Sequence, residues 1–433
     1  MPGSLSPDWK KAVISSGCIC FKEMNQERDT PVNSQISINK QGQKMSAREI
    51  LLLYPHNFTD VRLGVNQRFA GIIGYLNESG FAIDLLAMRN FKSKWPAETI
   101  KKGLPGIRNL YLYDHSAGLK SAFIRNLTSF DFAANRNLLG KKITSLPDYS
   151  FNGLRKMFDR IVAAHSYGFI LISYIQWAKL LDGFNHPEIR KVLTIEDSLS
   201  TSLVEQFGND RLQAAFLEEE ARRVMLFDHV VCISMEEMGL FSQKAKGPGF
   251  HYVPVFLDPN PRRIGTKPEY DILFAGSDHP SNQRGIRWFF DRVFPLMPPD
   301  LKILCVGSIV QFVPDKVNVV KIGFTDDLHA LYHKARLTIN PLLDGTGMKV
   351  KLVESLAHGV PVVTTTAGLS GIRPELRHHF MVGDKPSEFA AAIDRLISDN
   401  GLYLDYSENL NRIFNEHFTT EVAARTLDTI FTG

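Results

Sequence analysis

The sequence has few cysteines, little excess charge and no long apolar run. Its 433 residues include 4 cysteines and carry a formal net charge of +4. Four scattered thiols are too few for a disulfide framework, and Cys18 and Cys20 have no second pair or nearby histidine that would complete a zinc site. Cys232 and Cys305 lie in apolar runs, which is typical of core packing. We therefore expect reduced thiols in a cytoplasmic protein.

Two further absences argue against a membrane-spanning or a nucleic-acid-binding protein. No apolar run is long enough to cross a bilayer, and the first residues, MPGSLSPDWKK, contain no signal-peptide core. The small net charge gives no reason to expect a nucleic-acid partner.

What the sequence does contain is a long alternation of strand-like and helix-like segments. With 44% hydrophobic and 22% charged residues, it has enough apolar material for two domains of ordinary size. Strands that alternate with helices predict parallel sheets covered on both faces. We expect an irregular leader, an N-terminal Rossmann-like domain, a linker, a C-terminal Rossmann-like domain and a C-terminal helical segment, over residues 1–47, 48–256, 257–269, 270–400 and 401–433.

Apolar strand patterns recur in both predicted domains. In the first, strands are expected at Ile50–Tyr54, Ala82–Met88, Gly168–Tyr174, Val192–Ile195, Val230–Ser234 and Tyr252–Val255. In the second, they are expected at Asp271–Ala275, Lys302–Gly307, Val319–Ile322, Leu337–Pro341, Val360–Thr366 and Phe380–Val382. Ligands of such sheets bind beyond the carboxyl ends of the strands, so two facing domains would hold the ligand in the cleft between them.

The most informative segment is LLDGTGMKVKLVESLAHGVPVVTTT, residues 342–366, which is typical of a glycine loop, a helix and a buried strand. Gly345 and Gly347 leave the loop without side-chain bulk just before the helix. Free N–H groups at a helix start, with lysines beside them, favour a diphosphate. Lys349 is our first choice of phosphate ligand, because two lysines only two positions apart do not share a helix face. A carboxylate one turn further on, Glu354, suits a ribose or sugar hydroxyl.

The region 92–166 mixes lysine, arginine and aromatic residues and has two interpretations. One is a solvated helical face; the other is a basic-aromatic surface that meets anionic lipid headgroups or an anionic acceptor. The second interpretation would place the protein peripherally at the inner face of the membrane.

Several motifs resemble those of one enzyme family. In the second domain they are ILFAGS at 272–277, HPSN followed by GIRWF at 279–289, KILCVG at 302–307, GFTDDL followed by YHKA at 323–335, and the glycine loop. In the first domain they are YPH at 54–56, RLG at 62–64, FILISY followed by a tryptophan at 169–177, TIEDS at 194–198 and FDHVVCIS at 227–234. The chain thus resembles the retaining glycosyltransferases of family four (glycosyl transferases group 1), which have the GT-B fold.

This resemblance implies a site for a nucleotide-diphosphate sugar with uridine or guanosine as its base. The residues implied in catalysis are Lys349, Glu354 and Asp344. Those implied in donor binding are Gly64, Gly276, Arg284, Gly323, Phe324, Gly345, Thr346, Gly347, Met348, Lys349 and Glu354. No metal or cofactor is expected, because no Asp-x-Asp motif follows a predicted strand and lysines can neutralise the phosphates.

The chain departs from the family pattern at two positions. Thr346 stands where many members carry a first glutamate, and Asp344 lies two residues earlier. Glu196 stands where the family has the histidine of a His-Asp turn. The expected activity is transfer of a hexose to a hydroxyl of a glycan, a lipid-linked acceptor or a small molecule, as in polysaccharide biosynthesis. A nucleotide-sugar epimerase or hydrolase of the same fold, and a catalytically silent nucleotide- or glycan-binding member, are the alternatives.

Overall fold

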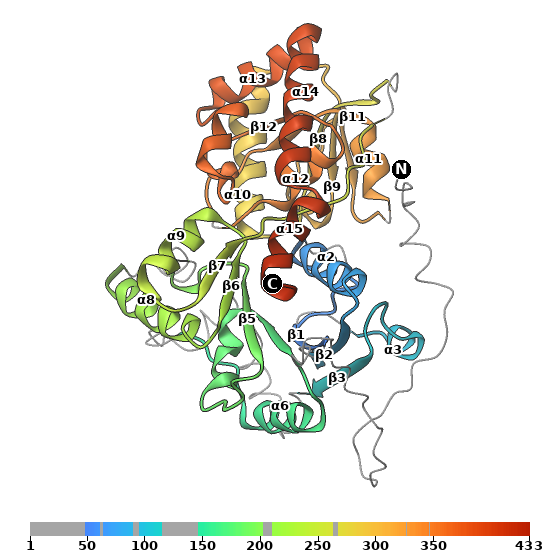
Figure 1. Cartoon of the computed structure of the whole chain (residues 1–433). Coiled ribbons are helices and arrows are strands. Elements are labelled where there is room, and N and C mark those ends of the chain that lie inside the picture. The colour runs from blue at the N-terminus through green and yellow to red at the C-terminus, as the bar shows by residue number, and fades with distance from the viewer. Residues whose placement is uncertain are drawn as a thin grey trace, which may run out of the picture. The chain divides into compact units, whose positions relative to one another are not determined.

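The computed structural model describes eight stretches of the chain, which form two compact units (Figure 1). One unit runs up to Leu193 and includes Leu226–Asp228, and the other comprises Thr194–Met225 and His229–Gly433. The leader 1–47, residues 92–94 and 115–145 of the basic-aromatic region, and Thr346 lie outside the description, so the predictions made for them stay untested. The described residues are 48–60, 64–89, 95–114, 146–201, 210–262, 267–325, 327–345 and 347–433.

The first sheet has seven strands in the order β3-β2-β1-β4-β5-β6-β7. Strand β1 pairs in parallel with β2 and β4, β2 with β3, and β6 with β7. The strands are β1 Glu49–Leu53, β2 Ala82–Arg89, β3 Asn109–Asp114, β4 Phe169–Ser173, β5 Arg190–Ile195, β6 His229–Cys232 and β7 Gly249–Tyr252. The helices along this part of the chain include α2 Gly64–Glu78, α3 Ala97–Lys102, α6 Asn152–Ala164, α8 Asp210–Val224 and α9 Met235–Lys244.

The second sheet has six strands, all parallel, in the order β10-β9-β8-β11-β12-β13. They are β8 Tyr270–Ala275, β9 Ile303–Val306, β10 Val319–Ile322, β11 Ala335–Asn340, β12 Val362–Thr364 and β13 Met381–Val382. The α-helices are α10 Pro280–Trp288, α11 Leu328–His333, α12 Val350–Ala357, α13 Pro386–Ser398, α14 Asn400–His417 and α15 Thr420–Phe431.

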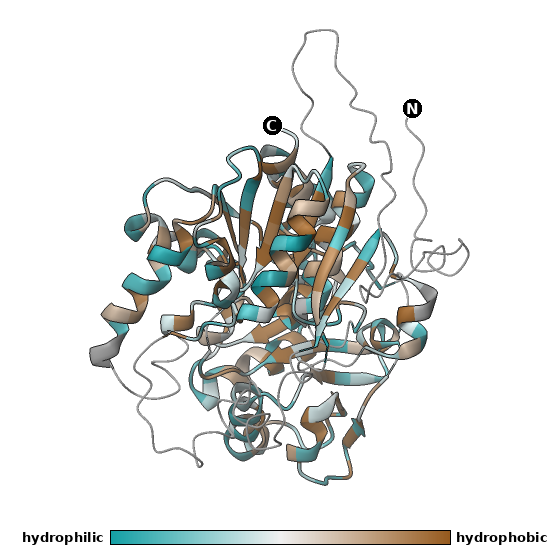
Figure 2. Ribbon diagram, turned by 90° about the horizontal axis from the view of Figure 1, so that it is seen from below, coloured by the Kyte–Doolittle hydropathy of each residue, from teal (hydrophilic) through white to brown (hydrophobic). Residues whose placement is uncertain are grey.

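Successive side chains of each strand point to opposite faces of the second sheet, and both faces are apolar. Ile272 and Phe274 of β8 belong to one buried cluster, while Leu273 between them belongs to another. The first cluster is packed by residues of α10, α12, α13 and α14, and the second by Tyr332 of α11. Figure 2 shows the apolar colouring concentrated on the strands.

These observations confirm the predicted α/β class with parallel sheets, but some element boundaries were wrong. The expected strand Tyr252–Val255 lies earlier in the chain, as β7, and β3 was not predicted. All six residues of β3 are partly exposed, so its sequence NLYLYD carries little of the apolar signal of a buried strand. Helix α9 lies where a helix between two strands was expected, but no bounds were predicted for it, although Ser234 accepts a hydrogen bond from the N–H of Glu237 as its N-cap.

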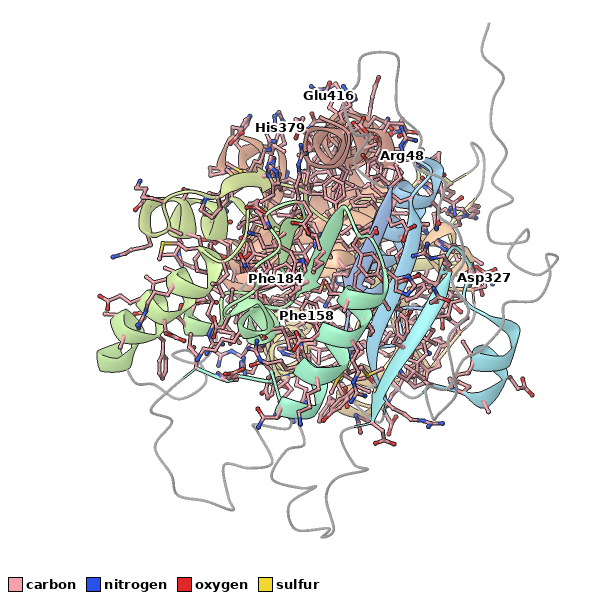
Figure 3. All side chains as sticks on the ribbon, turned by 60° about the horizontal axis from the view of Figure 1, so that its bottom comes forward. Arg48, Phe158, Phe184, Asp327, His379 and Glu416 are labelled. Carbon is pink, nitrogen blue, oxygen red and sulfur yellow. The ribbon has the colours of Figure 1, made fainter. Side chains whose placement is uncertain are left out.

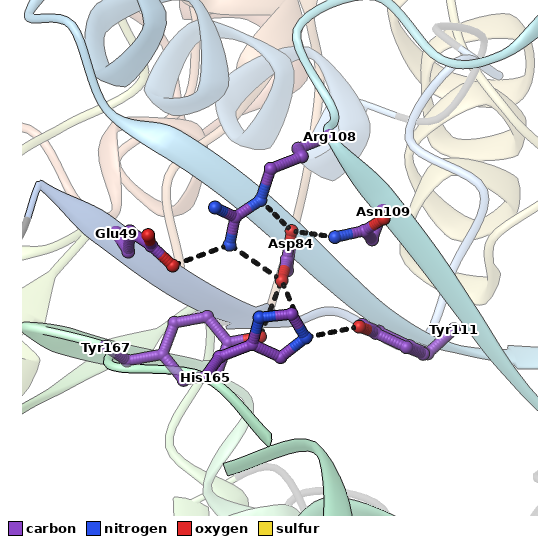
Figure 4. A network of polar contacts seen from close by, with 7 residues as sticks. All are labelled: Glu49, Asp84, Arg108, Asn109, Tyr111, His165 and Tyr167. Carbon is purple, nitrogen blue, oxygen red and sulfur yellow. Dashed lines mark hydrogen bonds and ion pairs between the residues drawn. The ribbon is translucent and has the colours of Figure 1, made fainter. Parts of the chain in front are cut away.

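Aromatic and polar side chains fix the first unit internally. Phe158 of α6 and Phe184, both labelled in Figure 3, have ring centroids 5.9 Å apart. At the amino-terminal edge of the sheet, the fully buried Asp84 accepts hydrogen bonds from Arg108 at 2.8 and 3.0 Å and from the Tyr167 hydroxyl at 2.6 Å (Figure 4). Arg108 also donates to Glu49 at 2.8 Å, so one guanidinium links β1 and β2.

Among the helices that the structure describes, none combines the length and the apolar character needed to cross a membrane.

Candidate active site

The candidate site lies at the carboxyl edge of the second sheet, where the strand order reverses. Strand β8 comes first in this sheet and lies between β9 and β11, so the connections after β8 and β11 leave toward opposite sides. Ligands of doubly wound sheets bind at such a switch point. Gly276 follows β8, and the glycine loop follows β11.

Helix α10 lies very close to the end of β11. A Cβ atom placed on Gly285 would be 2.5 Å from the carbonyl oxygen of Pro341, so only glycine permits this approach. The N-terminus of α10 is capped by His279, whose side chain accepts from the N–H of Ser281. Close packing thus brings the start of α10 to the loop that precedes α12.

The two glycines of the loop have positive φ angles. Gly345 has φ +107° and Gly347 has φ +71°, both in the region that favours glycine. A Cβ atom on Gly347 would be 2.4 Å from Oδ1 of Asp197, and one on Gly371 would be 2.7 Å from Cα of Met348. The backbone of the loop is therefore packed too tightly to accept side chains at these positions.

Arg284 and Asp344, both predicted as site residues, contact each other. The guanidinium donates to the carboxylate through Nε at 2.6 Å and Nη2 at 2.7 Å. The side chains keep 51% and 41% of their surface exposed, so the pair lies open to a ligand. The bond to Arg284 lowers the pKa of Asp344, which is therefore charged at neutral pH.

The two lysines have different roles in the structure. Helix α12 begins at Val350 with Lys349 as its N-cap, and the Lys349 Nζ donates to the carbonyl of Gly345 at 3.0 Å. Lys351 reaches α10, where its Nζ donates to Oδ1 of Asn282 at 2.5 Å. This bond joins the first turns of α10 and α12, and the Arg284–Asp344 pair joins α10 to the loop that precedes α12.

Glu354 lies one turn into α12 and is held by a residue of α11. The hydroxyl of Tyr332 donates to Glu354 Oε2 at 2.9 Å, and the Tyr332 ring is 2% exposed. Burial and then the charge of Glu354 raise the pKa of this tyrosine well above its usual value, so it stays a donor. Glu354 itself is partly exposed, as a ligand carboxylate must be.

The remaining predicted binding residues lie at loops or element ends. Gly323 and Phe324 follow β10, and the Phe324 side chain is 67% exposed. Gly64 is the first residue of α2. The structure thus places Gly276, Gly323 and the glycine loop at the carboxyl edge of one sheet, whereas Gly64 belongs to the other unit.

The turn after β5 contains Glu196, which stands where the family has a histidine. Glu196 is 6% exposed and accepts from the Thr194 hydroxyl at 3.3 Å. Glu237 of α9 lies beside this turn and accepts from the N–H of Ser198 at 2.9 Å. Its other oxygen, Oε2, has no hydrogen-bond partner among the described residues, and burial followed by the charge of Asp197 raises the Glu237 pKa well above its usual value.

Sequence reasoning missed two residues that shape the carboxyl edge of the second sheet. Asn282 and Tyr332 lie inside motifs that we quoted, but their contacts to Lys351 and Glu354 join different elements and cannot be read from spacing. Tyr174, at the end of β4, is the described non-glycine residue with a positive φ, +73°. Such strain tends to occur at functional positions, and the Tyr174 ring lies 5.7 Å from that of His56.

Comparison with known proteins agrees with this geometry. Residues 269–399 match the family model Glycosyl transferases group 1. A 44.6 kDa protein of the cps region of Klebsiella pneumoniae is 23% identical over 157 residues, which cover 33% of this chain and 38% of that protein. The chain spans 38% and 47% of the length of the curated relatives it matches.

Solved structures show the fold over most of the chain. Sucrose-phosphate synthase from Thermosynechococcus elongatus has a TM-score of 0.65 at 16% identity, covering 89% of this chain and 98% of that one. Anabaena HepE in complex with UDP has a TM-score of 0.61 at 13% identity, covering 89% and 99%. These likenesses confirm the predicted GT-B fold.

Proposed function

We propose that this protein is a glycosyltransferase that transfers a hexose from a nucleotide-diphosphate sugar to a hydroxyl acceptor. One observation carries the proposal: the family match covers the segment in which the glycine loop, the starts of α10 and α12, and Glu354 come together. HepE, which has the same fold, is in complex with UDP, and this supports a uridine nucleotide as the first donor to test.

Each residue of this edge has a proposed role in donor binding. The N–H groups of the glycine loop and of the first turn of α12 hold the diphosphate, with Arg284 beside them. Glu354, oriented by Tyr332, accepts hydrogen bonds from the ribose hydroxyls. Lys349 holds the loop in shape through the Gly345 carbonyl.

The chemistry requires stabilisation of the departing diphosphate more than it requires a strong base. The bond between the anomeric carbon and the phosphate oxygen breaks, and a bond forms between that carbon and the acceptor oxygen. In a transfer with retention, the departing phosphate oxygen takes the proton of the acceptor hydroxyl. Helix N–H groups and cationic side chains stabilise the negative charge that develops there. Asp344 takes the place of the missing first glutamate beside the sugar.

The acceptor we propose is a glycan or a lipid-linked sugar of a surface polysaccharide. The support is the matching protein from the cps region of Klebsiella pneumoniae. Glu196 and Asp197, in the turn after β5, are the residues we propose beside the acceptor, since the family places its His-Asp turn there.

Thermal-shift measurements with UDP, GDP and their sugars test the donor site. A ligand that binds the folded protein raises its stability by about 2.7 kcal/mol at a concentration of about 100 times Kd. We expect one nucleotide series to raise Tm and the Glu354→Ala variant to lose the shift. The Glu408→Ala variant, on the exposed face of α14, is the matched control and keeps it. No shift with any nucleotide would overturn the donor assignment.

A further inference from the structure

The two close contacts of the Lys351 amino group are to uncharged side chains. Its Nζ donates to Oδ1 of Asn282 and lies 4.5 Å from the centroid of the Phe274 ring. Asn282 is 8% exposed and Phe274 is fully buried. Neither side chain supplies a negative charge to balance an ammonium, and Lys351 is only partly exposed, so the ammonium loses part of its hydration without an ion-pair partner among the described residues.

Desolvation consequently lowers the pKa of Lys351 to about 7, with the charge of Lys349 lowering it and that of Glu354 raising it. His279, at the start of α10, has its own pKa lowered by burial and then by Lys349, Arg284 and Lys351. The start of α12 and the start of α10 thus share an excess of positive charge.

The other ionisable groups at this edge already have partners. Arg284 is paired with Asp344, Lys349 donates to the Gly345 carbonyl, and Glu354 accepts from Tyr332. Lys351 also has an acceptor, Oδ1 of Asn282, but this acceptor is uncharged, so an anion that arrives between the two helix starts would be its first ion-pair partner among the described residues.

We propose that Lys351 takes up a proton when the nucleotide diphosphate binds and becomes the counterion of its phosphates, with Asn282 positioning the amino group. The inference rests on the donor site proposed above. One proton passes from solvent to the amine, and no bond of the donor changes. The free site avoids a partly desolvated ammonium without an ion-pair partner, and the bound site gains a charge matched to the diphosphate.

This proton uptake determines whether affinity for the diphosphate rises or falls with pH. The bound protein holds more protons than the free protein above neutral pH, so affinity for the diphosphate falls as pH rises. With one proton coupled, Kd increases by up to about tenfold per pH unit above about pH 7. Below that range the lysine is already charged in the free protein, and its contribution to the pH dependence disappears.

Calorimetric titration of the full chain with UDP counts the protons directly. The experiment is made at about pH 8.5. A phosphate with a second pKa of about 6 is fully ionised there, so any protons taken up on binding belong to the protein. The binding enthalpy in two buffers of different ionisation enthalpy gives the number of protons. We expect uptake of close to one proton by the wild type, and a Kd that increases between about pH 7 and pH 9.

Two variants test whether Lys351 is the group that takes up the proton. Lys351→Met removes the titrating group and should abolish the uptake and weaken UDP binding. Lys334→Met, on the exposed end of α11 where Lys334 pairs with Glu269 at 3.0 Å, is the matched lysine control and should keep both. If Lys351→Met does not fold, the proton count and pH dependence of the wild type still decide.

The outcomes separate this inference from the proposed function. UDP or GDP binding without proton uptake would overturn the role of Lys351 and leave the donor site standing. Uptake that persists in Lys351→Met would assign the proton to another group, such as His279, and would also overturn it. Failure of both nucleotides to bind would overturn the donor site itself.

Discussion

At the scale of single residues, the central contact is the hydrogen bond from Tyr332 to Glu354. It joins α11 to α12 and fixes one oxygen of the carboxylate proposed to bind ribose. The glycine loop and Glu354 could be predicted from the sequence, because phosphate-binding loops and the residues after them are local patterns. Tyr332 could not, because 22 residues separate it from Glu354 and only the packed fold brings them together.

Removing this hydroxyl should weaken nucleotide binding. We expect Tyr332→Phe to increase Kd for UDP about tenfold, or about 1.4 kcal/mol, because Glu354 loses its fixed orientation. The matched control is Tyr406→Phe, which removes another buried tyrosine hydroxyl, bonded to the Val362 carbonyl at 2.7 Å. Calorimetry should show reduced affinity in the first variant and wild-type affinity in the second. Equal affinities in both would show that Tyr332 does not position Glu354.

At the scale of elements, the site depends on how closely α10 approaches β11. The class and order of most elements followed from apolar periodicity. The close approach of α10 to β11 did not, because a glycine in a helical sequence pattern does not show which atoms will lie against it. Only the structure shows that Gly285 lies against the Pro341 backbone.

A methyl group at Gly285 should therefore be costly. We expect Gly285→Ala to destabilise the protein by about 1–3 kcal/mol through overpacking, and to weaken UDP binding by displacing α10. Gly239→Ala in α9, where nothing lies within 4 Å of the new Cβ, should instead stabilise the protein by about 0.5–1 kcal/mol. Thermal denaturation distinguishes the two. A Tm of Gly285→Ala at or above that of the wild type would contradict the packing argument.

At the scale of the whole molecule, a stabilising polar network and the proposed binding site lie at opposite ends of parallel strands, in different sheets. The amino edge of the first sheet holds the buried Asp84 network, and the carboxyl edge of the second holds the proposed donor site. The two-domain α/β plan was predictable because strand and helix patterns alternate along the chain. The Asp84 network was not, because its members come from three strands and the turns between them.

This division predicts that stability and nucleotide binding can be altered separately. Arg108→Met leaves the buried Asp84 with fewer donors and should destabilise the protein by about 2 kcal/mol, less than a fully buried pair because Arg108 is 34% exposed. UDP affinity at a temperature below unfolding should stay at the wild-type value. In Glu354→Ala we expect the reverse, with affinity lost and Tm of the free protein little changed. Loss of UDP affinity in Arg108→Met would contradict the separation.

The most direct test of the proposed activity is a transfer assay with UDP- and GDP-sugars labelled in the sugar. Each donor is incubated with and without glycan and lipid-linked acceptors, and both the label and the released nucleotide are followed. We predict that nucleotide diphosphate is released when an acceptor is present, that the label appears on the acceptor, and that Glu354→Ala abolishes both. Release of free sugar at the same rate without acceptor would identify a hydrolase, conversion of the bound sugar would identify an epimerase, and nucleotide binding without turnover would identify a silent member; each would contradict the account.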